Sequence, residues 1–348
     1  MISKTLAQLY AEHQGKVSDK WSLYLEEYDR IFGSSRDKPV KLLEIGVQNG
    51  GALEIWSKYF PKGEKFIGCD INPECSRLRY DESRVEVVIG DANSDNVQTE
   101  ILKHSPEFDI VIDDGSHVSG DIVKSFARYF PNITDGGVFV AEDLHCSYWK
   151  DFEGGLFYPF SAITFFKHLA DVINHEHWGV PKNSSELLTG FFEKYGFRLD
   201  EDTLDQVHSI EFVNSICIVR KCAKQSNVLG SRFIAGDIEE IVAGHDKIQG
   251  KPLEIPPQSH NFWSSRELPP SEELPLRLEE LDSRSEQIDH LNQAVAEREG
   301  LIAHLNQTVA ERESELQQVL ASTSWRVTRP IRAIKSYFLN TTFDNDSK

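Results

Sequence analysis

The stretch LLEIGVQNGG, residues 42–51, decides the fold class. An apolar run leads into a turn that contains Gly46 and Gly50, and a helical pattern begins at Ala52. Glycines in such a turn let the backbone approach a ligand closely, and the start of the helix adds free amide donors. A dinucleotide-binding turn would have the pattern G-x-G-x-x-G, but Gln48 stands at the second glycine position, which disfavours NAD. A glycine-rich turn without a ligand remains the alternative.

Around this stretch, short runs rich in Val, Ile and Phe recur every 20–30 residues or so. Such a rhythm predicts an α/β fold with a mostly parallel sheet that is covered by helices on both faces. The pair VHSIEFV (207–213) and SICIVRKC (215–222) predicts an antiparallel hairpin at one edge of the sheet. The predicted parallel strands are VKLLEI (40–45), KFIGCD (65–70), VEVVIG (85–90), FDIVID (108–113) and GVFVAE (137–142).

The 348 residues suggest more than one unit. We expect an N-terminal helical segment over 1–38, the α/β domain over 39–222 and a proline-containing linker over 223–270. In the first segment, aromatic residues recur at spacings of three and four, so one helix face would pack on the domain or wall a ligand pocket. This face consists of Trp21, Tyr24, Leu25, Tyr28 and Phe32.

A seven-residue repeat follows the linker and predicts a coiled coil over 271–320. Its d positions alternate between Arg (284, 298, 312) and Leu or Val (291, 305, 319). The arginines would either restrict the choice of partner or the number of strands, or make the helix only marginally stable. Through this segment we expect the chain to form a homo-oligomer or to bind a partner protein. The a positions are all apolar: Leu274, Leu281, Ile288, Val295, Ile302, Val309 and Leu316.

The tail, residues 321–348, has a different composition. Its part 322–338 carries four basic residues (Arg326, Arg329, Arg332 and Lys335) and no acid, interleaved with apolar side chains. This composition is compatible with peripheral contact with an anionic membrane, or with a solvated or partner-bound end.

Charge and cysteine content narrow the function classes. With 37 basic and 56 acidic residues the net charge is −19, which argues against nucleic acid as a partner. The five cysteines include no C-x-x-C pair, so we expect a reducing compartment rather than a disulfide framework. No apolar run is long enough for a membrane span, and the N-terminus has no apolar signal core. We therefore expect a cytoplasmic protein, which the tail could bring to the inner face of the membrane.

Polar residues follow the predicted strands at the carboxyl edge of the sheet. Asp70 ends the second strand, where a carboxylate can accept hydrogen bonds from a ribose diol. Asp91 and Ala92 follow the third strand, and Asp91 could accept a hydrogen bond from an adenine amino group. Each aspartate by itself would more commonly be a loop or cap residue. Together with Glu44 they predict a ligand site.

The fourth and fifth strands end in four acids: Asp113, Asp114, Glu142 and Asp143. Neighbouring strands lie about 4.8 Å apart, so these carboxylates would converge and repel one another unless a cation or a proton intervenes. An all-oxygen set favours Mg²⁺ or Mn²⁺ over zinc, whereas the alternative is that some of these acids cap helices.

Two histidines lie near these acids. An imidazole can take up a proton near neutral pH, which makes His117 and His145 candidate general bases. We favour His117, which follows Asp114 by three residues.

Six motifs within about residues 15–222 together resemble the metal-dependent S-adenosylmethionine (SAM) sugar O-methyltransferases, which include the macrolide-sugar O-methyltransferases. Glu44, Gly46 and Gly50 match E-x-G-x-x-x-G, which is similar to motif I of class I SAM methyltransferases. The resemblance implies a Rossmann-like class I methyltransferase sheet, mostly parallel with an antiparallel edge hairpin. The motifs are SDKWSLYLEEY, LLEIGVQNGG, GCDINP, GDAN, IDDGSH and AEDLHCSYW.

The resemblance also implies roles for individual residues. Asp114, Glu142 and Asp143 would bind Mg²⁺ (or Mn²⁺), and His117 would be the catalytic base. The residues implied to hold SAM are Glu44, Gly46, Gly50, Asp70, Asp91, Ala92 and Asp113.

The implied activity is SAM- and Mg-dependent O-methylation of a sugar hydroxyl. Similar methyltransferases with C-terminal coiled coils are associated with bacterial surface-polysaccharide assembly, which implies a glycan acceptor. A non-catalytic SAM- or glycan-binding assembly protein is the alternative, and the intact acid and histidine set disfavours it.

Overall fold

The protein was analysed as a computed structural model that describes residues 4–266 and 270–343. The chain divides into two compact units, Met1–Pro275 and Leu276–Lys348. The remaining residues of the predicted N-terminal segment, linker and tail (1–3, 267–269 and 344–348) lie outside the described residues.

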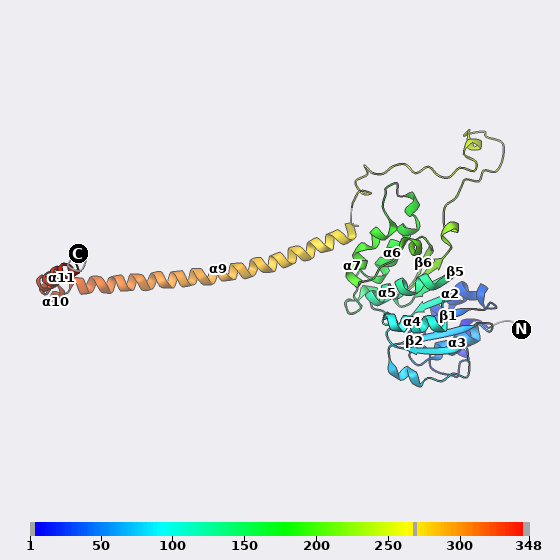
Figure 1. Cartoon of the computed structure of the whole chain (residues 1–348), viewed down its shortest axis with the longest axis horizontal. Coiled ribbons are helices and arrows are strands. Elements are labelled where there is room, and N and C mark those ends of the chain that lie inside the picture. The colour runs from blue at the N-terminus through cyan, green and yellow to red at the C-terminus, as the bar shows by residue number, and fades with distance from the viewer. Residues whose placement is uncertain (1–3, 267–269, 344–348) are drawn as a thin grey trace. The chain divides into compact units, whose positions relative to one another are not determined.

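The first unit is built on a seven-stranded sheet in the order β3-β2-β1-β4-β5-β7-β6 (Figure 1). The first five strands in this order are parallel, and β7 and β6 form an antiparallel hairpin beside β5. The predicted fold class and edge hairpin are therefore confirmed. The strands are β1 (Lys41–Ile45), β2 (Lys65–Asp70), β3 (Val85–Ile89), β4 (Phe108–Asp113), β5 (Ile133–Ala141), β6 (Val207–Val213) and β7 (Ile216–Lys221).

Strand register places the predicted polar residues at one edge of the sheet. Ile45 pairs with Cys69 on one side and with Asp113 on the other, and Asp113 pairs with Ala141. The residues that follow β1, β2, β4 and β5 therefore emerge side by side. In open α/β sheets, ligands bind at this carboxyl edge.

Helices cover both faces of the sheet, because alternate residues of each buried strand point to opposite sides. On one face, Leu43 and Val111 pack with helices α4, α5 and α6. On the other, Leu42 and Ile110 pack with α1, α2 and α3. The helices of this unit are α1 (Leu6–Ala11), α2 (Ser22–Phe32), α3 (Gly51–Tyr59), α4 (Asp95–His104), α5 (Ser119–Tyr129), α6 (Ala162–Ile173), α7 (Thr189–Tyr195) and α8 (Glu201–Leu204), with short 3₁₀ turns between them.

The aromatic face of the N-terminal segment serves both of its predicted roles. Tyr24, Tyr28 and Phe32 are buried in the core against α3, whereas Trp21, just before α2, is 60% exposed. Trp21 also borders a cavity of about 520 Å³ at the carboxyl edge of the sheet. The helix is thus anchored by one part of its aromatic face and contributes to a pocket with another.

Strand β5 begins four residues earlier than predicted, at Ile133 rather than at Gly137. The sequence TDGG is typical of a turn, and Gly136 indeed has a positive φ of 79°. A register shift between Phe108 and Ile110 in the β4–β5 ladder accommodates this irregular stretch, so the strand continues through it.

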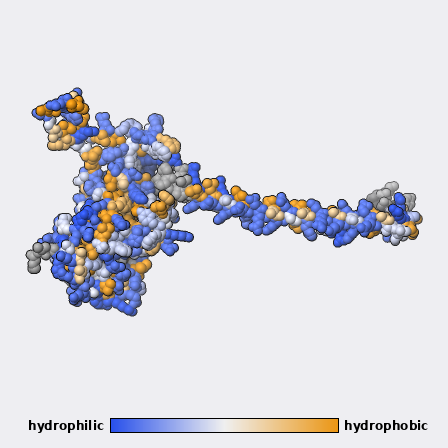
Figure 2. All heavy atoms as spheres, turned by 180° about the vertical axis from the view of Figure 1, so that it is seen from behind, coloured by the Kyte–Doolittle hydropathy of each residue, from blue (hydrophilic) through white to orange (hydrophobic). Residues whose placement is uncertain are grey.

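After β7, residues 223–266 lie in the region predicted to be a linker and have little regular structure. They contain two short 3₁₀ turns and an isolated bridge between Ser231 and Pro252. The second unit contains α9 (Pro270–Ala321), α10 (Thr323–Val327) and α11 (Arg329–Phe343). In Figure 2 hydrophobic residues are scattered along a largely hydrophilic α9. The predicted long helix is confirmed. Its a-position residues from Leu281 to Leu316, such as Ile288 (57%) and Ile302 (57%), are exposed, so its pairing stays a prediction. None of the described helices is both long and apolar enough to cross a membrane.

Candidate active site

Two neighbouring cavities lie at the carboxyl edge of the sheet, one of about 520 Å³ and one of about 210 Å³. Both are bordered by Gly46, Asp70 and Gly115, so the loop after β1 separates them. Below, the larger one is called the acidic cavity, because Glu44, Asp114, Glu142 and Asp143 line it. The smaller one is called the Asp91 cavity, because Asp91, Ala92 and Asp113 line it.

The loop between β1 and α3 has a conformation that requires glycine. Gly46 has a φ of +95°, and a Cβ there would lie 2.0 Å from the carbonyl oxygen of Asp114. Gly50, with a φ of +82°, precedes the first turn of α3. Glycine is therefore required at Gly46 and Gly50 by the packing of the protein itself, and Gly46 also borders both cavities. Its predicted role in binding a cofactor stays a prediction.

Asp70 holds this loop in place. Its Oδ2 accepts hydrogen bonds from the amides of Val47 and Gln48, both at 2.8 Å, and its Oδ1 accepts one from Asn72. A carboxylate offers about four acceptor positions, so about one remains for a ribose hydroxyl. Asp70 thus shapes the turn as well as bordering both cavities.

Glu44 is fully buried and lines the acidic cavity. Within the described residues, neither of its carboxylate oxygens has a hydrogen-bond partner. Burial raises the pKa of this carboxyl group, although the ammonium group of Lys20, 3.4 Å away, opposes the shift. Apart from this one long contact with Lys20, the buried carboxylate is unsatisfied, which is costly and marks a position where a further cationic or hydrogen-bonding ligand group would fit.

Asp113 and Asp114 are consecutive but face different cavities. Asp113 borders the Asp91 cavity, accepts a hydrogen bond from the amide of Gly115 at 3.2 Å, and is 3% exposed. Burial raises its pKa to about 6. Asp114 borders the acidic cavity instead. The two aspartates therefore line different cavities, and their predicted roles at a cofactor (Asp113) and at a metal ion (Asp114) stay predictions.

A lysine lies among the acids. The Nζ atom of Lys20 lies 2.5 Å from Asp114, 2.7 Å from Glu142 and 3.4 Å from Glu44, and the lysine side chain is only 2% exposed. The hydroxyl of Tyr28 donates a further hydrogen bond to Glu142. The repulsion expected among these carboxylates is therefore relieved by a side chain of the protein itself.

Burial and charge act against each other in this cluster. Burial by itself would lower the pKa of Lys20, but Glu142, Asp114 and Glu44 outweigh it and raise the pKa well above the usual value for lysine. Burial raises the pKa of Glu142, and Lys20 opposes that shift. The Tyr28 pKa is also raised, by burial and by the adjacent Glu142, so this phenol remains a hydrogen-bond donor at neutral pH.

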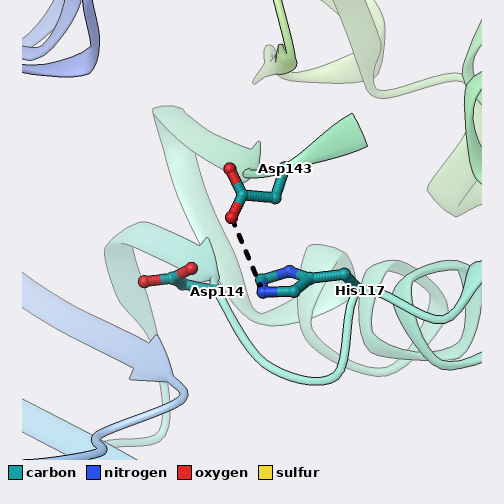
Figure 3. Close-up of side chains that lie close together, drawn as sticks. All are labelled: Asp114, His117 and Asp143. Carbon is teal, nitrogen blue, oxygen red and sulfur yellow. Dashed lines mark ion pairs between the residues drawn. The ribbon is translucent and has the colours of Figure 1, made fainter. Parts of the chain in front are cut away.

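Figure 3 shows the side chains of a group that could hold a metal ion, and one of them, Asp114, also contacts Lys20. Asp114, His117 and Asp143 each offer one ligand atom, and these atoms lie within 4.8 Å of one another. Glu142 is not part of this group, because its Oε1 contacts Lys20 and Tyr28. Two of the three predicted metal ligands, Asp114 and Asp143, therefore lie in this group. Its third member is His117, which was predicted to be the catalytic base.

His117 is placed better for proton transfer than His145. Its Nε2 lies 3.6 Å from Asp143, it borders the acidic cavity, and among the described residues its Nδ1 has no hydrogen-bond partner. His117 and Asp143 both have a positive φ (59° and 53°), which non-glycine residues adopt rarely and mostly at functional sites. The Nδ1 of His145 is instead hydrogen-bonded to the hydroxyl of Ser215 at 2.5 Å.

The sequence predicted no role for Lys20 and no polar contact for Trp21 or Tyr24. Lys20 and Trp21 lie within the quoted motif SDKWSLYLEEY, but nothing local indicates that they reach strand ends more than 90 residues away. The Trp21 indole and the Tyr24 hydroxyl both donate to Oδ1 of Asp143, at 2.9 and 2.8 Å. The regular spacing of Tyr24 and Tyr28 predicted a packed helix face but not these polar contacts.

Part of the chain is similar in sequence to known O-methyltransferases. No family model matches the chain. The chain is 35% identical over 171 residues to the 8-demethyl-8-alpha-L-rhamnosyl tetracenomycin-C 2'-O-methyltransferase of Streptomyces olivaceus, covering 46% of this chain and 44% of that protein. It is 35% identical over 173 residues to the mycinamicin VI 2''-O-methyltransferase of Micromonospora griseorubida, covering 47% and 42%. The chain thus spans less than half the length of these relatives.

A solved structure agrees with these relatives. The MycE methyltransferase from the mycinamycin biosynthetic pathway, in complex with Mg, SAH and mycinamycin VI, has a TM-score of 0.53 and 27% sequence identity, covering 64% of this chain and 55% of that one. The resemblance stated from the motifs is therefore confirmed: over about half of its length, the chain is a homologue of the macrolide and polyketide sugar O-methyltransferases.

Proposed function

We propose that the chain is a SAM- and Mg²⁺-dependent O-methyltransferase that acts on a sugar hydroxyl. The observation that carries the proposal is the pair of cavities at the carboxyl edge of the sheet, one lined by converging carboxylates and His117, the other by Asp91 and Asp113. Named relatives with this activity support the same chemistry.

The residues present fit SAM. Glu44 and Gly46 line the acidic cavity together, and the Glu44 carboxylate has only the long contact with Lys20, so it suits the ammonium group of the methionine part. Asp70, Asp91, Ala92 and Asp113 border the neighbouring cavity, where the adenosine would lie. Ribose hydroxyls and an adenine amino group are donors, and these carboxylates are acceptors.

The residues present also fit a hard divalent cation. Asp114 and Asp143 provide carboxylate oxygens, the donors that Mg²⁺ and Mn²⁺ prefer, and Glu142 lies next to them in the chain and the cavity. We propose Asp114, Glu142 and Asp143 as the ligand set, with Lys20 as the countercharge of Glu142 and Glu44. When bound, the ion would act as a Lewis acid that makes a sugar hydroxyl more acidic.

In the proposed reaction His117 takes the proton of the sugar hydroxyl. The oxygen forms a bond to the SAM methyl carbon, the bond from that carbon to sulfur breaks, and the proton ends on the imidazole. Asp143, 3.6 Å from Nε2 of His117, stabilises the imidazolium that forms. Trp21 and Tyr24 hold Asp143 in position for this role through their hydrogen bonds to its Oδ1.

For the acceptor we propose a sugar of a bacterial surface polysaccharide or glycoconjugate. The relatives are named for sugars on macrolides and tetracenomycin. Support for a larger assembly comes from α9, whose heptad apolar residues are exposed, since a helix with an apolar stripe is stabilised by a partner. We propose that α9 pairs in a coiled coil, as a homo-oligomer or with a partner protein.

We propose a cytoplasmic location, supported by free cysteines such as the buried Cys69 and Cys217, which suit a reducing compartment. The tail would add peripheral contact with an anionic membrane. It carries Arg326, Arg329, Arg332 and Lys335 between exposed apolar residues such as Ile331. Vesicle sedimentation of the full chain with anionic and with neutral lipid tests this contact.

The function itself is tested by measuring the transfer of a labelled methyl group from SAM. The acceptors are rhamnosides and a panel of glycans from the cell envelope of the organism that produces the protein. We expect label in a sugar fraction that depends on Mg²⁺, and calorimetric binding of SAM but not of NAD. Binding of SAM without transfer to any acceptor would instead favour a non-catalytic assembly protein.

A further inference from the structure

Aromatic rings form a row that begins at Trp21, which borders the acidic cavity. The ring of Trp21 lies 6.2 Å from that of His145 with an edge-on geometry, and His145 lies 5.0 Å from Trp149. The row continues to Phe152, 5.9 Å from Trp149. Trp21 is 60% exposed and Trp149 is 51% exposed, so both indoles face solvent instead of packing in the core.

Polar contacts at its inner end hold this row. The indole Nε1 of Trp21 donates to Asp143, and Nδ1 of His145 pairs with Ser215. Trp21 and His145, fixed in this way, lose little conformational entropy when a ligand binds, and Trp149 packs edge-on against His145. Exposed aromatic side chains in fixed positions beside a catalytic cavity are typical of ligand sites rather than of a solvated surface.

The position of the row selects the class of ligand. Trp21 borders the cavity that contains Asp114, His117 and Asp143, so a ligand on the rings would reach the proposed reaction centre. A pyranose ring presents weakly positive C–H groups on one face, which match the negative face of an indole, and hydroxyls at its rim, which match carboxylates and imidazole.

We propose that Trp21, His145 and Trp149 form the platform that binds the acceptor sugar ring and turns one of its hydroxyls toward His117. This assignment rests on the proposed function for the location of the chemistry, but the binding site itself does not depend on turnover. Trp149 is the informative position, because its described ring contacts are with His145 and Phe152 and not with the proposed metal ligands.

The test compares Trp149→Ala with Trp263→Ala in the full chain. Trp263 is a matched control: it is 70% exposed, and its described ring contact is an edge-on contact with Phe262, in the segment after β7. Binding of methyl α-L-rhamnopyranoside and of the methyl glycosides of glucose, galactose and mannose is followed by saturation-transfer NMR. SAM binding is measured by calorimetry on the same samples, to verify that the variants are folded.

We expect at least one glycoside to bind the parent protein, with saturation transfer concentrated on the protons of one sugar face. Trp149→Ala should weaken that binding about threefold to tenfold, the range for one aromatic contact, and raise the acceptor KM by a similar factor with little change in kcat. In Trp263→Ala, glycoside binding and the acceptor KM should be unchanged. SAM affinity should be unchanged in both variants.

The two proposals fail separately. Equal glycoside affinity and KM in both variants, or no binding of any of the four glycosides to the parent protein, would overturn the platform even if methyl transfer occurs. Glycoside binding that is weakened by Trp149→Ala in a protein without methyl transfer would leave the platform standing and remove the proposed activity.

Discussion

Replacing Lys20 with methionine removes the charge at the centre of the acid cluster and keeps most of the side-chain volume. Three carboxylates surround the Lys20 ammonium group within 3.4 Å, and Glu44 and Glu142 are at most 2% exposed at their side chains. In Lys20→Met these carboxylates would face one another without a countercharge. The variant therefore tests whether the cluster depends on this lysine.

The size of the effect follows from burial. Removing one partner of a buried ion pair costs about 3–5 kcal/mol of folding stability, because the remaining charge is left uncompensated. The loss should be largest near pH 8 and should shrink toward pH 5. Burial already raises the pKa of Glu142 and of Glu44, so these carboxylates take up protons as the pH falls toward 5. Their protonation removes the repulsion.

Denaturant unfolding of the full chain, followed by tryptophan fluorescence at several pH values, measures this loss. The control is Lys103→Met, which breaks an exposed pair with Glu100 and should leave stability unchanged within error. Adding Glu142→Gln to Lys20→Met should restore part of the stability, because one of the unpaired charges disappears. A Lys20→Met variant as stable as the parent at every pH would refute this account of the cluster.

The remaining predictions concern the reaction and one buried acid. EDTA should abolish methyl transfer and Mg²⁺ should restore it, whereas full activity in chelator would exclude the metal assignment. His117→Ala should lower kcat by about 10²–10⁴-fold with SAM affinity unchanged in calorimetry, and an unaltered rate would remove His117 from the mechanism. Asp113 has its pKa raised to about 6 from 3.8, so its stability contribution is greatest below pH 4 and falls as the pH rises toward 6. Between pH 4 and pH 6 the unfolding free energy of the parent should fall by about 3 kcal/mol relative to that of Asp113→Asn. If the unfolding free energies of the two proteins change with pH in parallel, the burial argument is wrong.

The strands were predictable because buried parallel strands are short, nearly continuous apolar runs, which few other elements of this chain resemble. Runs such as FDIVID (108–113) coincide with the observed strand. From strand order alone it also follows that residues after β4 and β5 meet at one edge. The start of β5 was not predictable, because the register shift opposite Phe108 leaves no mark in the local pattern.

The composition of the acid cluster was only partly predictable. Crowded carboxylates indicate that a positive charge is present, but they do not indicate which one. Lys20 reaches Glu142 across 122 positions of sequence, and such a long-range pair has no periodicity that a local pattern could contain. For the same reason the sequence predicted the hydrophobic role of Tyr28 correctly but not its hydrogen bond to Glu142.

Anomalous diffraction from crystals grown with Mn²⁺ and S-adenosylhomocysteine tests the central claim most directly. One strong manganese peak is expected at about 2.1 Å from carboxylate oxygens of Asp114, Glu142 and Asp143, with the adenosine beside Asp91 and Asp113. Manganese bound elsewhere, or no manganese at these strand ends while S-adenosylhomocysteine is present, would contradict it.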